Sequence, residues 1–522
     1  MTNESNTRVL IAGAGPVGLS LAIELGLRGV DCMLVERGDG IPRVPKMSSV
    51  SARGMEFCRR WGIADKVRYA VWSKTHPLDF VYVSTMVGDE LARLRIPSYA
   101  ERQGKMDYSP EGAASCPQIF FDPILAEKVK SIPKVSPRYG TRLVAFEQDE
   151  GGVRAQLADE RSGESHTIAA DYLVGCDGAG GIVRRSLGIP LDGLGPIATS
   201  VNVFFRSAEF SGMHDKGWAH IYRFFDDDGC WAELIAVDGT ELYRLSVFQD
   251  ATPDLGGDSY LRRLAGRDFA YEILDVSPWE RRDFLARSYR RGRVLIAGDA
   301  AHEMSPTAGA GMHTGICEAV NLAWKLAAVL EGWGGPRLLE SYEAECRPVA
   351  AQNVALSTAM FDAIAALPGA AAFGEAAAAD GDLPRRFTPP NQRKAQIRYE
   401  DSPICVADGT PPPEDPNELT PSARPGTRAP HCWLADGRST LDLFGDGFVL
   451  VRFGAPDADV GPLRAAACAR GVPLEVVDID HGEAAAIYEK PLVLVRPDGH
   501  VAWRGDTLPD DAQALIDRVR GA

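Results

Sequence analysis

Cysteine pairs at metal-binding or redox spacing are missing from this sequence. The ten cysteines are scattered along the chain, and no two follow a Cys-x-x-Cys pattern. That spacing is typical of zinc sites and of dithiol redox centres, so we expect neither. Scattered cysteines in a long chain are typical of reduced, mostly buried thiols. They are Cys32, Cys58, Cys116, Cys176, Cys230, Cys317, Cys346, Cys405, Cys432 and Cys468.

An excess of positive charge and a long apolar segment are also absent. The chain has 56 basic and 72 acidic residues, a formal net charge of −16, so nucleic acid and anionic membrane surfaces are not expected partners. Residues 1–6 are polar and precede a short apolar run, unlike a signal peptide. No segment approaches the roughly 20 apolar residues of a membrane span. We therefore expect a cytoplasmic protein that uses no membrane.

The chain is long enough, and has enough hydrophobic residues, to form more than one hydrophobic core. Its 522 residues are 45% hydrophobic and 25% charged. Chains of this size divide into domains, so we expect two or three.

A dinucleotide-binding pattern lies at the start of the chain. Residues 7–12 are an apolar strand pattern and residues 19–27 a helical one, and the loop between them is rich in glycine. Glycine there permits a tight turn, brings backbone amides close to a pyrophosphate and lets the helix pack on the strand. The loop residues that we assign to cofactor binding are Gly13, Gly15, Pro16 and Gly18.

An acidic residue follows at the spacing that this pattern requires. Residues 31–35 read as the next strand, which ends at Glu36, roughly twenty residues beyond the glycine loop. We expect Glu36 to bind a ribose hydroxyl and Arg37 to lie beside the cofactor. FAD and NAD both carry adenosine diphosphate, so these residues alone fit either. A surface glutamate at a strand end is the simpler alternative.

A second glycine-rich segment distinguishes the two cofactors. Residues 293–297 form a short apolar strand pattern that ends in Gly298-Asp299, and residues 315–330 have helical spacing. An aspartate at such a strand end can accept hydrogen bonds from a polyol, and the start of the helix can stabilise negative charge on a reduced flavin. The cofactor-binding residues assigned to this segment are Asp299, Pro306, Gly309, Gly311, Met312 and His313.

These segments resemble the class A flavoprotein aromatic hydroxylases, the p-hydroxybenzoate and phenol hydroxylase type. The resemblance implies FAD as cofactor, NADPH or NADH as reductant and dioxygen as co-substrate. It implies hydroxylation of a phenolic or polycyclic aromatic ring through a C4a-hydroperoxyflavin. Pro306 corresponds to the family proline near the flavin face. His313 stands where most relatives have Asn, so it is expected to tune the flavin, contact substrate, or replace the amide as a neutral hydrogen-bonding group.

Three further positions follow from the same resemblance. Lys46 occupies the place of a family arginine, keeping the charge without the planar guanidinium. Gln118, ahead of a helix expected from Asp122, corresponds to a flavin-contacting glutamine. Asp177 belongs to an Asp-Gly motif associated with flavin and nicotinamide, although Gly181 replaces the usual serine. A plain strand-to-turn Asp-Gly and exposed surface residues are the alternatives.

The expected fold class is α/β, a Rossmann-like FAD-binding domain with an inserted antiparallel sheet and a C-terminal thioredoxin-like domain. Alternating patterns such as residues 200–205 and 241–247 predict the antiparallel strands, and residues 447–504 predict strand, helix, strand and hairpin. The FAD-binding domain is expected to be discontinuous, with residues 1–75, 115–187 and 285–365, and the substrate domain to comprise residues 76–114 and 188–284. A connection is expected over 366–420. The thioredoxin-like domain is expected over 421–522, without the dithiol.

The sequence therefore predicts a flavin-dependent aromatic monooxygenase, with a homodimer as a further expectation for the family. Two other functions stay open. One is a flavoenzyme on the same fold that oxidises or decarboxylates a natural product without hydroxylating it. The other is a flavin-carrying protein that binds an aromatic compound without turnover.

Overall fold

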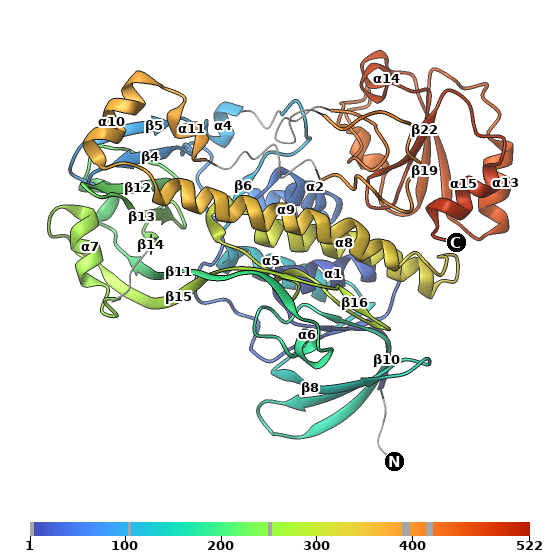
Figure 1. Ribbon diagram of the computed structural model, residues 1–522, viewed down its shortest axis with the longest axis horizontal. Coiled ribbons are helices and arrows are strands. Elements are labelled where there is room, and N and C mark those ends of the chain that lie inside the picture. Colours follow the sequence, from blue (N-terminus) through green and yellow to red (C-terminus); the bar gives the residue numbers. More distant parts are fainter. Residues whose placement is uncertain (1–4, 103–105, 249–252, 389–396, 414–420) are drawn as a thin grey trace.

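A computed structural model describes residues 5–102, 106–248, 253–388, 397–413 and 421–522. Three large sheets with their helices form most of the molecule, and two long helices run across it between the sheets (Figure 1). These helices are α8 (Gly311–Leu330) and α9 (Glu340–Ala365). Among the described residues, no single helix has the length and apolar composition to cross a membrane. Only α9 and the helix Ala370–Ala379 meet those criteria together, as a pair bent by 109°.

The first sheet confirms the Rossmann-like prediction. Its central strands β17, β10, β1, β2 and β7 pair in parallel, and helices α1 and α8 pack against each other beside them. Its strands are β1 (Ser5–Ala12), β2 (Cys32–Glu36), β7 (Val135–Tyr139), β8 (Thr141–Gln148), β9 (Val153–Asp159), β10 (Ser165–Gly175), β16 (Arg290–Arg291) and β17 (Val294–Ile296). Its helices include α1 (Pro16–Leu27), α2 (Ala52–Arg60), α3 (Ala64–Arg68), α5 (Gln118–Lys130) and α6 (Ile182–Ser186).

Two long helices contain a proline. Helix α5 begins at Gln118 rather than Asp122, and Pro123 lies inside it, where proline removes one backbone hydrogen bond of the helix. Helix α9 begins at Glu340 and continues to Ala365 although it contains Pro348.

The second sheet is antiparallel except at one pair. Strand β12 pairs in parallel with β4, because β4 comes from a much earlier part of the chain and is added at the side of the later hairpins. In spatial order its strands are β18 (His302–Glu303), β15 (Glu272–Ala286), β11 (Leu191–Arg206), β14 (Leu242–Val247), β13 (Gly229–Ala236), β12 (Ile221–Asp226), β4 (Phe80–Val83) and β5 (Glu90–Leu94).

Part of the segment expected as a connection packs on this second sheet. Helices α10 (Ala370–Ala379) and α11 (Leu383–Arg386) contact β5, and the Phe373 ring stacks on Phe225 with 4.5 Å between ring centroids. Helices α4 (Tyr99–Arg102) and α7 (Asp258–Ala265) and the short pair β3 (Ser49–Val50) with β6 (Ala114–Ser115) complete this region.

The third sheet consists of the predicted strand, helix, strand and hairpin, and its strands have the spatial order β20, β19, β21, β22. Strands β19 (Phe448–Phe453) and β20 (Leu474–Ile479) are parallel and flank α13 (Gly461–Ala469) in sequence. The hairpin is β21 (Leu492–Val495) with β22 (Val501–Gly505), and α14 (Gly482–Tyr488) and α15 (Ala512–Val519) complete the unit.

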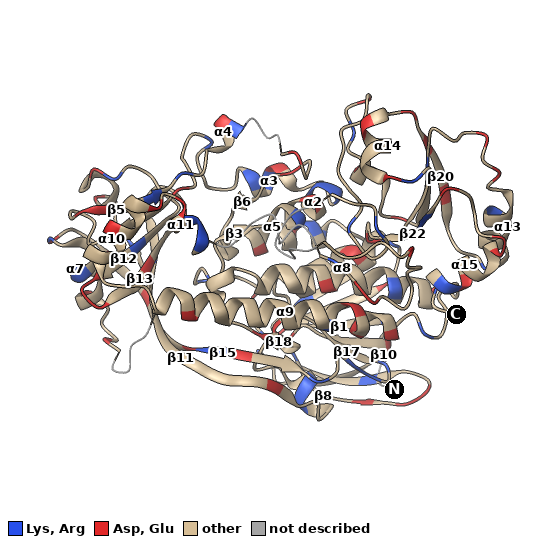
Figure 2. Ribbon diagram, turned by 45° about the horizontal axis from the view of Figure 1, so that its top comes forward, with Lys and Arg blue, Asp and Glu red and all other residues tan. Residues whose placement is uncertain are grey.

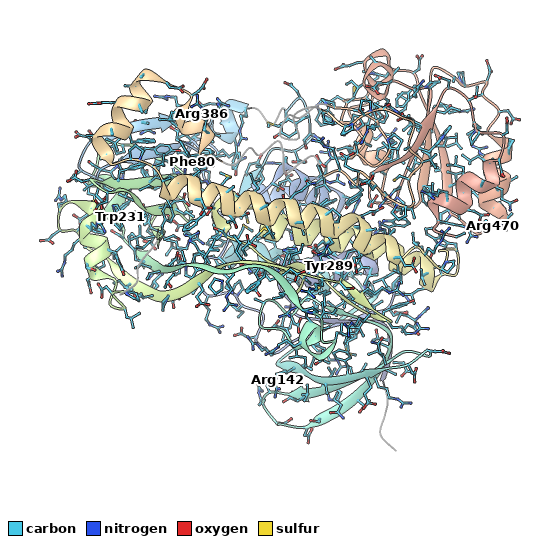
Figure 3. All side chains as sticks on the ribbon, viewed as in Figure 1. Phe80, Arg142, Trp231, Tyr289, Arg386 and Arg470 are labelled. Carbon is cyan, nitrogen blue, oxygen red and sulfur yellow. The ribbon has the colours of Figure 1, made fainter. Side chains whose placement is uncertain are left out.

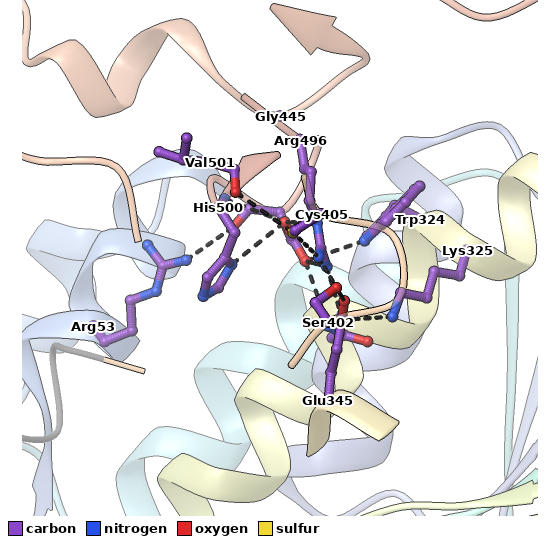
Figure 4. A network of polar contacts seen from close by, with 12 residues as sticks. Arg53, Trp324, Lys325, Glu345, Ser402, Cys405, Gly445, Arg496, His500 and Val501 are labelled. Carbon is purple, nitrogen blue, oxygen red and sulfur yellow. Dashed lines mark hydrogen bonds and ion pairs between the residues drawn. The ribbon is translucent and has the colours of Figure 1, made fainter. Parts of the chain in front are cut away.

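Buried charges join this third unit to the long helices (Figure 4). The Arg496 guanidinium donates to both carboxylate oxygens of Glu345 on α9, at 2.6 and 2.9 Å, and also to Asp498. The Lys325 ammonium, from α8, donates to Glu345 at 2.7 Å. Asp498 in turn accepts from the Trp324 indole at 3.2 Å. Because these four charged side chains are almost fully buried and alternate in sign, they fix the third sheet on α8 and α9.

Candidate functional site

The loop between β1 and α1 is closed by glycine. Gly13 has φ +103°, and a Cβ added there would lie 2.3 Å from the Cys176 carbonyl oxygen at the end of β10. A Cβ added to Gly18 would lie 2.0 Å from the Gly13 carbonyl oxygen. Only glycine allows this approach of helix, loop and neighbouring strand. Nothing lies within 4 Å of a Cβ added to Gly15, which leaves this part of the loop open toward a ligand.

Glu36 holds the same loop from the end of β2. Its carboxylate accepts hydrogen bonds from the Ala14 amide at 3.0 Å and from the Gly38 amide at 2.8 Å. A carboxylate has about four acceptor positions, so capacity remains for a ribose hydroxyl. Arg37, the next residue, is exposed.

The Gly298-Asp299 turn is fixed from beneath by a buried pair. The Glu318 carboxylate, on α8, accepts from the Gly298 amide at 2.8 Å and contacts the His302 Nε2 atom at 3.2 Å. Burial alone would lower the pKa of His302, and the adjacent Glu318 raises it above its ordinary value. Glu318 was not predicted, although a charged residue inside an apolar helix pattern is a signal for it.

Asp299 faces a cavity from this turn. Surrounding protein raises the pKa of its carboxyl group, yet its side chain stays exposed because it borders the cavity. None of the described residues donates a hydrogen bond to it. A carboxylate placed in this way can receive the hydroxyl groups of a polyol chain.

Helix α8 begins at the same cavity. Gly309 has φ +57° after the short helix Pro306–Ala308, and the hydrogen bond from the Thr314 amide to the Ala310 carbonyl is the first of the helix. The amides of the first turn therefore have no carbonyl partner within the helix. Their partial positive charge favours an anion or a reduced flavin ring at Gly311 and Met312.

The cavity has a volume of about 460 Å³ and brings most of the predicted residues together. It lies between the cofactor loops of the first sheet and one face of the second, where Phe80, labelled in Figure 3, also lines it. The predicted residues that line it are Gly15, Pro16, Lys46, Gln118, Asp299, Pro306, Gly309, Gly311 and Met312. Gly13, Gly18, Glu36, Arg37, Asp177 and His313 are outside its lining.

Gln118 is oriented by a buried acid. Its amide nitrogen donates to Asp122 at 2.9 Å, one turn further along α5. Burial raises the pKa of Asp122 to about 7, with Gln118 and Lys46 acting in the opposite direction. Gln118 is thereby held at the cavity while Asp122 stays behind it.

Asp177 and His313 have structural partners of their own. Asp177 accepts from the Val183 amide at 3.0 Å and so caps α6, and a Cβ added to Gly181 would lie 2.1 Å from the Asp177 Cγ atom. Glycine in place of the family serine therefore leaves room for this carboxylate. His313 is buried and faces α2, since a Cβ added to Gly54 would lie 4.0 Å from its Nδ1 atom.

The second sheet contributes charged residues that our sequence analysis did not identify. Arg223 pairs with Glu233 at 2.9 Å across β12 and β13. Arg244 donates to the Pro45 carbonyl at 2.5 Å, next to Lys46. Arg281 donates to Ser200 at 2.7 Å and to Ser305 at 3.1 Å, so it ties the Pro306 turn to the sheet. Arginines inside alternating apolar strands were the signal for them.

Comparisons with known proteins extend over the whole chain. The FAD binding domain family matches residues 6–357, and the aromatic-ring hydroxylase C-terminal family matches residues 422–522. Aklavinone 12-hydroxylase RdmE of Streptomyces purpurascens is 33% identical, covering 99% of this chain and 98% of that protein. FAD-dependent monooxygenase apdD of Emericella nidulans is 33% identical, covering 98% and 90%.

Solved structures agree with these relatives. RebC soaked with chromopyrrolic acid, with bound 7-carboxy-K252c, superposes with a TM-score of 0.92 at 39% identity and covers 99% of each chain. Aklavinone-11 hydroxylase in complex with FAD and aklavinone gives a TM-score of 0.83 at 30% identity and covers 99% of each chain.

Proposed function

We propose that this chain hydroxylates a flat, polycyclic phenolic compound. The proposal proceeds from its family, because the chain belongs to the FAD-dependent aromatic-ring hydroxylases. The chain is a flavin-dependent monooxygenase of the type that uses FAD, a nicotinamide nucleotide and dioxygen on aromatic substrates. The observation that carries the substrate proposal is the cavity itself, which has the cofactor loops on one side and a sheet with Phe80 and Phe248 on the other.

The residues present fit FAD. The glycine loop leaves open backbone at Gly15, Glu36 lies beside that loop, and Asp299 faces the cavity with its acceptor oxygens free of described donors. We propose that these three hold pyrophosphate, ribose and ribityl groups respectively, and that Lys46, Gln118 and the start of α8 surround the flavin ring. When bound, FAD would accept hydride from the nicotinamide nucleotide and activate dioxygen for transfer of one oxygen atom to the ring.

The chain's own residues would orient the substrate and exclude water. Arg281 holds Ser305, so Pro306 is fixed in the wall of the cavity, where it would limit the space left for substrate. The sheet side chains close the opposite wall, which protects the oxygen-transfer step from water. The burial of His313 beside α2, outside the lining of the cavity, supports a role other than direct substrate contact.

The domain division, the cytoplasmic location and a homodimer remain proposals. The three sheets support the division in outline, with α10 and α11 assigned to the substrate part by their contacts with β5. Analytical ultracentrifugation of the holoenzyme would test the dimer, since a single species at the monomer mass of 56.3 kDa would reject it.

The function is tested by anaerobic stopped-flow reduction of the FAD-loaded protein. NADPH and NADH are each mixed with the enzyme, with and without phenols, naphthols and larger polycyclic phenolics. Faster flavin reduction with one ligand class, followed in air by a product heavier by one oxygen atom, is the expected result. Reduction that is independent of every ligand, or a product without added oxygen, would instead favour the non-hydroxylating flavoenzyme. Ligand binding with no nicotinamide oxidation would favour a binding protein.

A further inference from the structure

A second, larger cavity adjoins the site. It has a volume of about 870 Å³ and lies where α3, the end of α4 and the third unit meet. Arg102 and Ala113 line both this outer cavity and the inner one, so the two are neighbours through these residues. Figure 2 shows α4, α3 and α2 in a row along one edge of the molecule, each with basic residues.

Aromatic rings with cations beside them line the outer cavity. The Lys74 ammonium lies 4.1 Å from the centroid of the Tyr69 ring, and the Arg102 guanidinium lies 5.3 Å from that of Tyr99. Tyr69 is 44% exposed, and Trp433 of the third unit is 40% exposed. Cations lie over the Tyr69 and Trp433 rings, and the parts of these rings that stay exposed offer an apolar surface against which a planar aromatic ligand can pack.

The charges around the outer cavity favour an anion. Its five basic residues are Arg59, Lys66, Arg68, Lys74 and Arg102, and its two acidic residues are Asp65 and Glu111. Glu111 already pairs with Arg59 and Arg68. Within the described part of the chain, neither Lys74 nor Arg102 has a carboxylate partner. Of these two cations, Arg102 lies at the boundary, because it also lines the inner cavity.

Arg102 has donors that the protein leaves unused. Its Nε and Nη2 atoms are buried and have no hydrogen-bond partner among the described residues. A partly buried guanidinium without a counter-charge is costly, and a bound carboxylate would offset that cost with charge-assisted hydrogen bonds. The inner cavity continues this pattern, because Arg244 and Arg281 also lack carboxylate partners within the described residues and the Arg244 Nε atom is buried without an acceptor.

We propose that the outer cavity is the route by which a planar aromatic carboxylate reaches the inner cavity, and that Arg102 selects for the negative charge at the boundary. The substrate part of this proposal deepens the proposed function and depends on it. The binding route does not depend on turnover, so the two can be tested separately.

The test compares two ligands that differ only in the carboxylate, 3-hydroxy-2-naphthoic acid and 2-naphthol. Association with the oxidised FAD-loaded enzyme is followed by stopped-flow flavin absorbance and ligand fluorescence at low and high salt. The variants are Arg102→Ala and Arg102→Lys. Arg154→Ala is the control, because Arg154 is an exposed arginine on β9 outside both cavities.

Arg102→Ala should slow association of the carboxylate about ten-fold at low salt, and the difference should shrink as salt screens the charge. Association of 2-naphthol should change less than about two-fold, and Arg102→Lys should retain part of the preference because it keeps the charge. An equal effect on both ligands, no effect on either, or no binding of either ligand would overturn the proposal. Normal carboxylate selectivity without ligand-stimulated flavin reduction would instead overturn only the proposed function.

Discussion

At the scale of single residues, Asp299 is the clearest test of cofactor binding. Replacing it by Asn keeps the shape but removes the charge that strengthens hydrogen bonds from hydroxyl groups. We expect FAD to bind about 10- to 100-fold more weakly, the equivalent of roughly 1.5–3 kcal/mol for a charged hydrogen bond. The apoprotein should be at least as stable as the wild type, because surrounding protein disfavours the carboxylate. FAD titration and urea unfolding measure the two effects, and undiminished FAD affinity would remove Asp299 from the site.

Asp122 predicts a pH dependence of stability. Burial raises its folded pKa to about 7, above that of the unfolded chain, so the folded state holds the proton more tightly. The stability associated with this proton is present at low pH and is lost as pH rises from about 4 to 7. Asp122→Asn, which stays neutral, should therefore gain up to about 4 kcal/mol relative to wild type between pH 4 and pH 8. Urea unfolding at both pH values checks this, and an unchanged difference between the proteins would contradict it.

The sequence predicted cofactor residues better than substrate residues, for a physical reason. The glycine loop and Gly298-Asp299 are local patterns, since a strand, a turn and a helix within some thirty residues create the geometry. Arg102, Arg223 and Arg244 meet at one cavity only because a mixed sheet brings distant segments together. Asp177 shows a further limit, because its hydrogen bond to Val183 and the space left by Gly181 depend on side-chain placement.

At the scale of elements, two glycines of one loop should fail in different ways. Gly18→Ala forces a Cβ against the Gly13 carbonyl oxygen, a backbone atom, so strand and helix must separate. We expect a loss of about 1–3 kcal/mol in the free energy of unfolding of the apoprotein. Gly15→Ala meets nothing within 4 Å and should leave that free energy within about 0.5 kcal/mol of wild type while weakening FAD binding. Equal destabilisation by both would contradict the assigned roles.

Element boundaries followed the strength of the local pattern. The first strand, helix and second strand were predicted closely, because apolar periodicity and glycine punctuation agree there. The alanine-rich segment after α9 was expected to connect domains, and its composition gave no sign of the contact between Phe373 and Phe225. The helix propensity of alanine can predict such a helix from the local sequence. It cannot predict where the helix packs, because the aromatic surface that it contacts comes from residues more than a hundred positions earlier.

At the scale of the whole molecule, the Glu345 network joins the third unit to the helix that starts at the cofactor cavity. Burial alone would raise the pKa of Glu345, but Arg496 and Lys325 lower it to about 2. Its stabilising charge is therefore present above the unfolded pKa and is lost only as pH falls toward 2. Glu345→Gln leaves two buried cations with too little negative charge. We expect a loss of about 3–5 kcal/mol at pH 7 that shrinks toward pH 3.

An exposed ion pair provides the matched control for Glu345. Arg142, labelled in Figure 3, pairs with Glu160 on the far hairpin at side-chain exposures of 50% and 41%. Glu160→Gln removes the same charge but should cost less than about 1 kcal/mol, because water already solvates both groups. Thermal and urea unfolding of both variants measure the two losses in the free energy of unfolding, and the loss for Glu345→Gln should be the larger. Equal small losses would show that the third unit is held mainly by its apolar contacts around Trp324 and Phe448, whose rings meet edge to face at 5.9 Å.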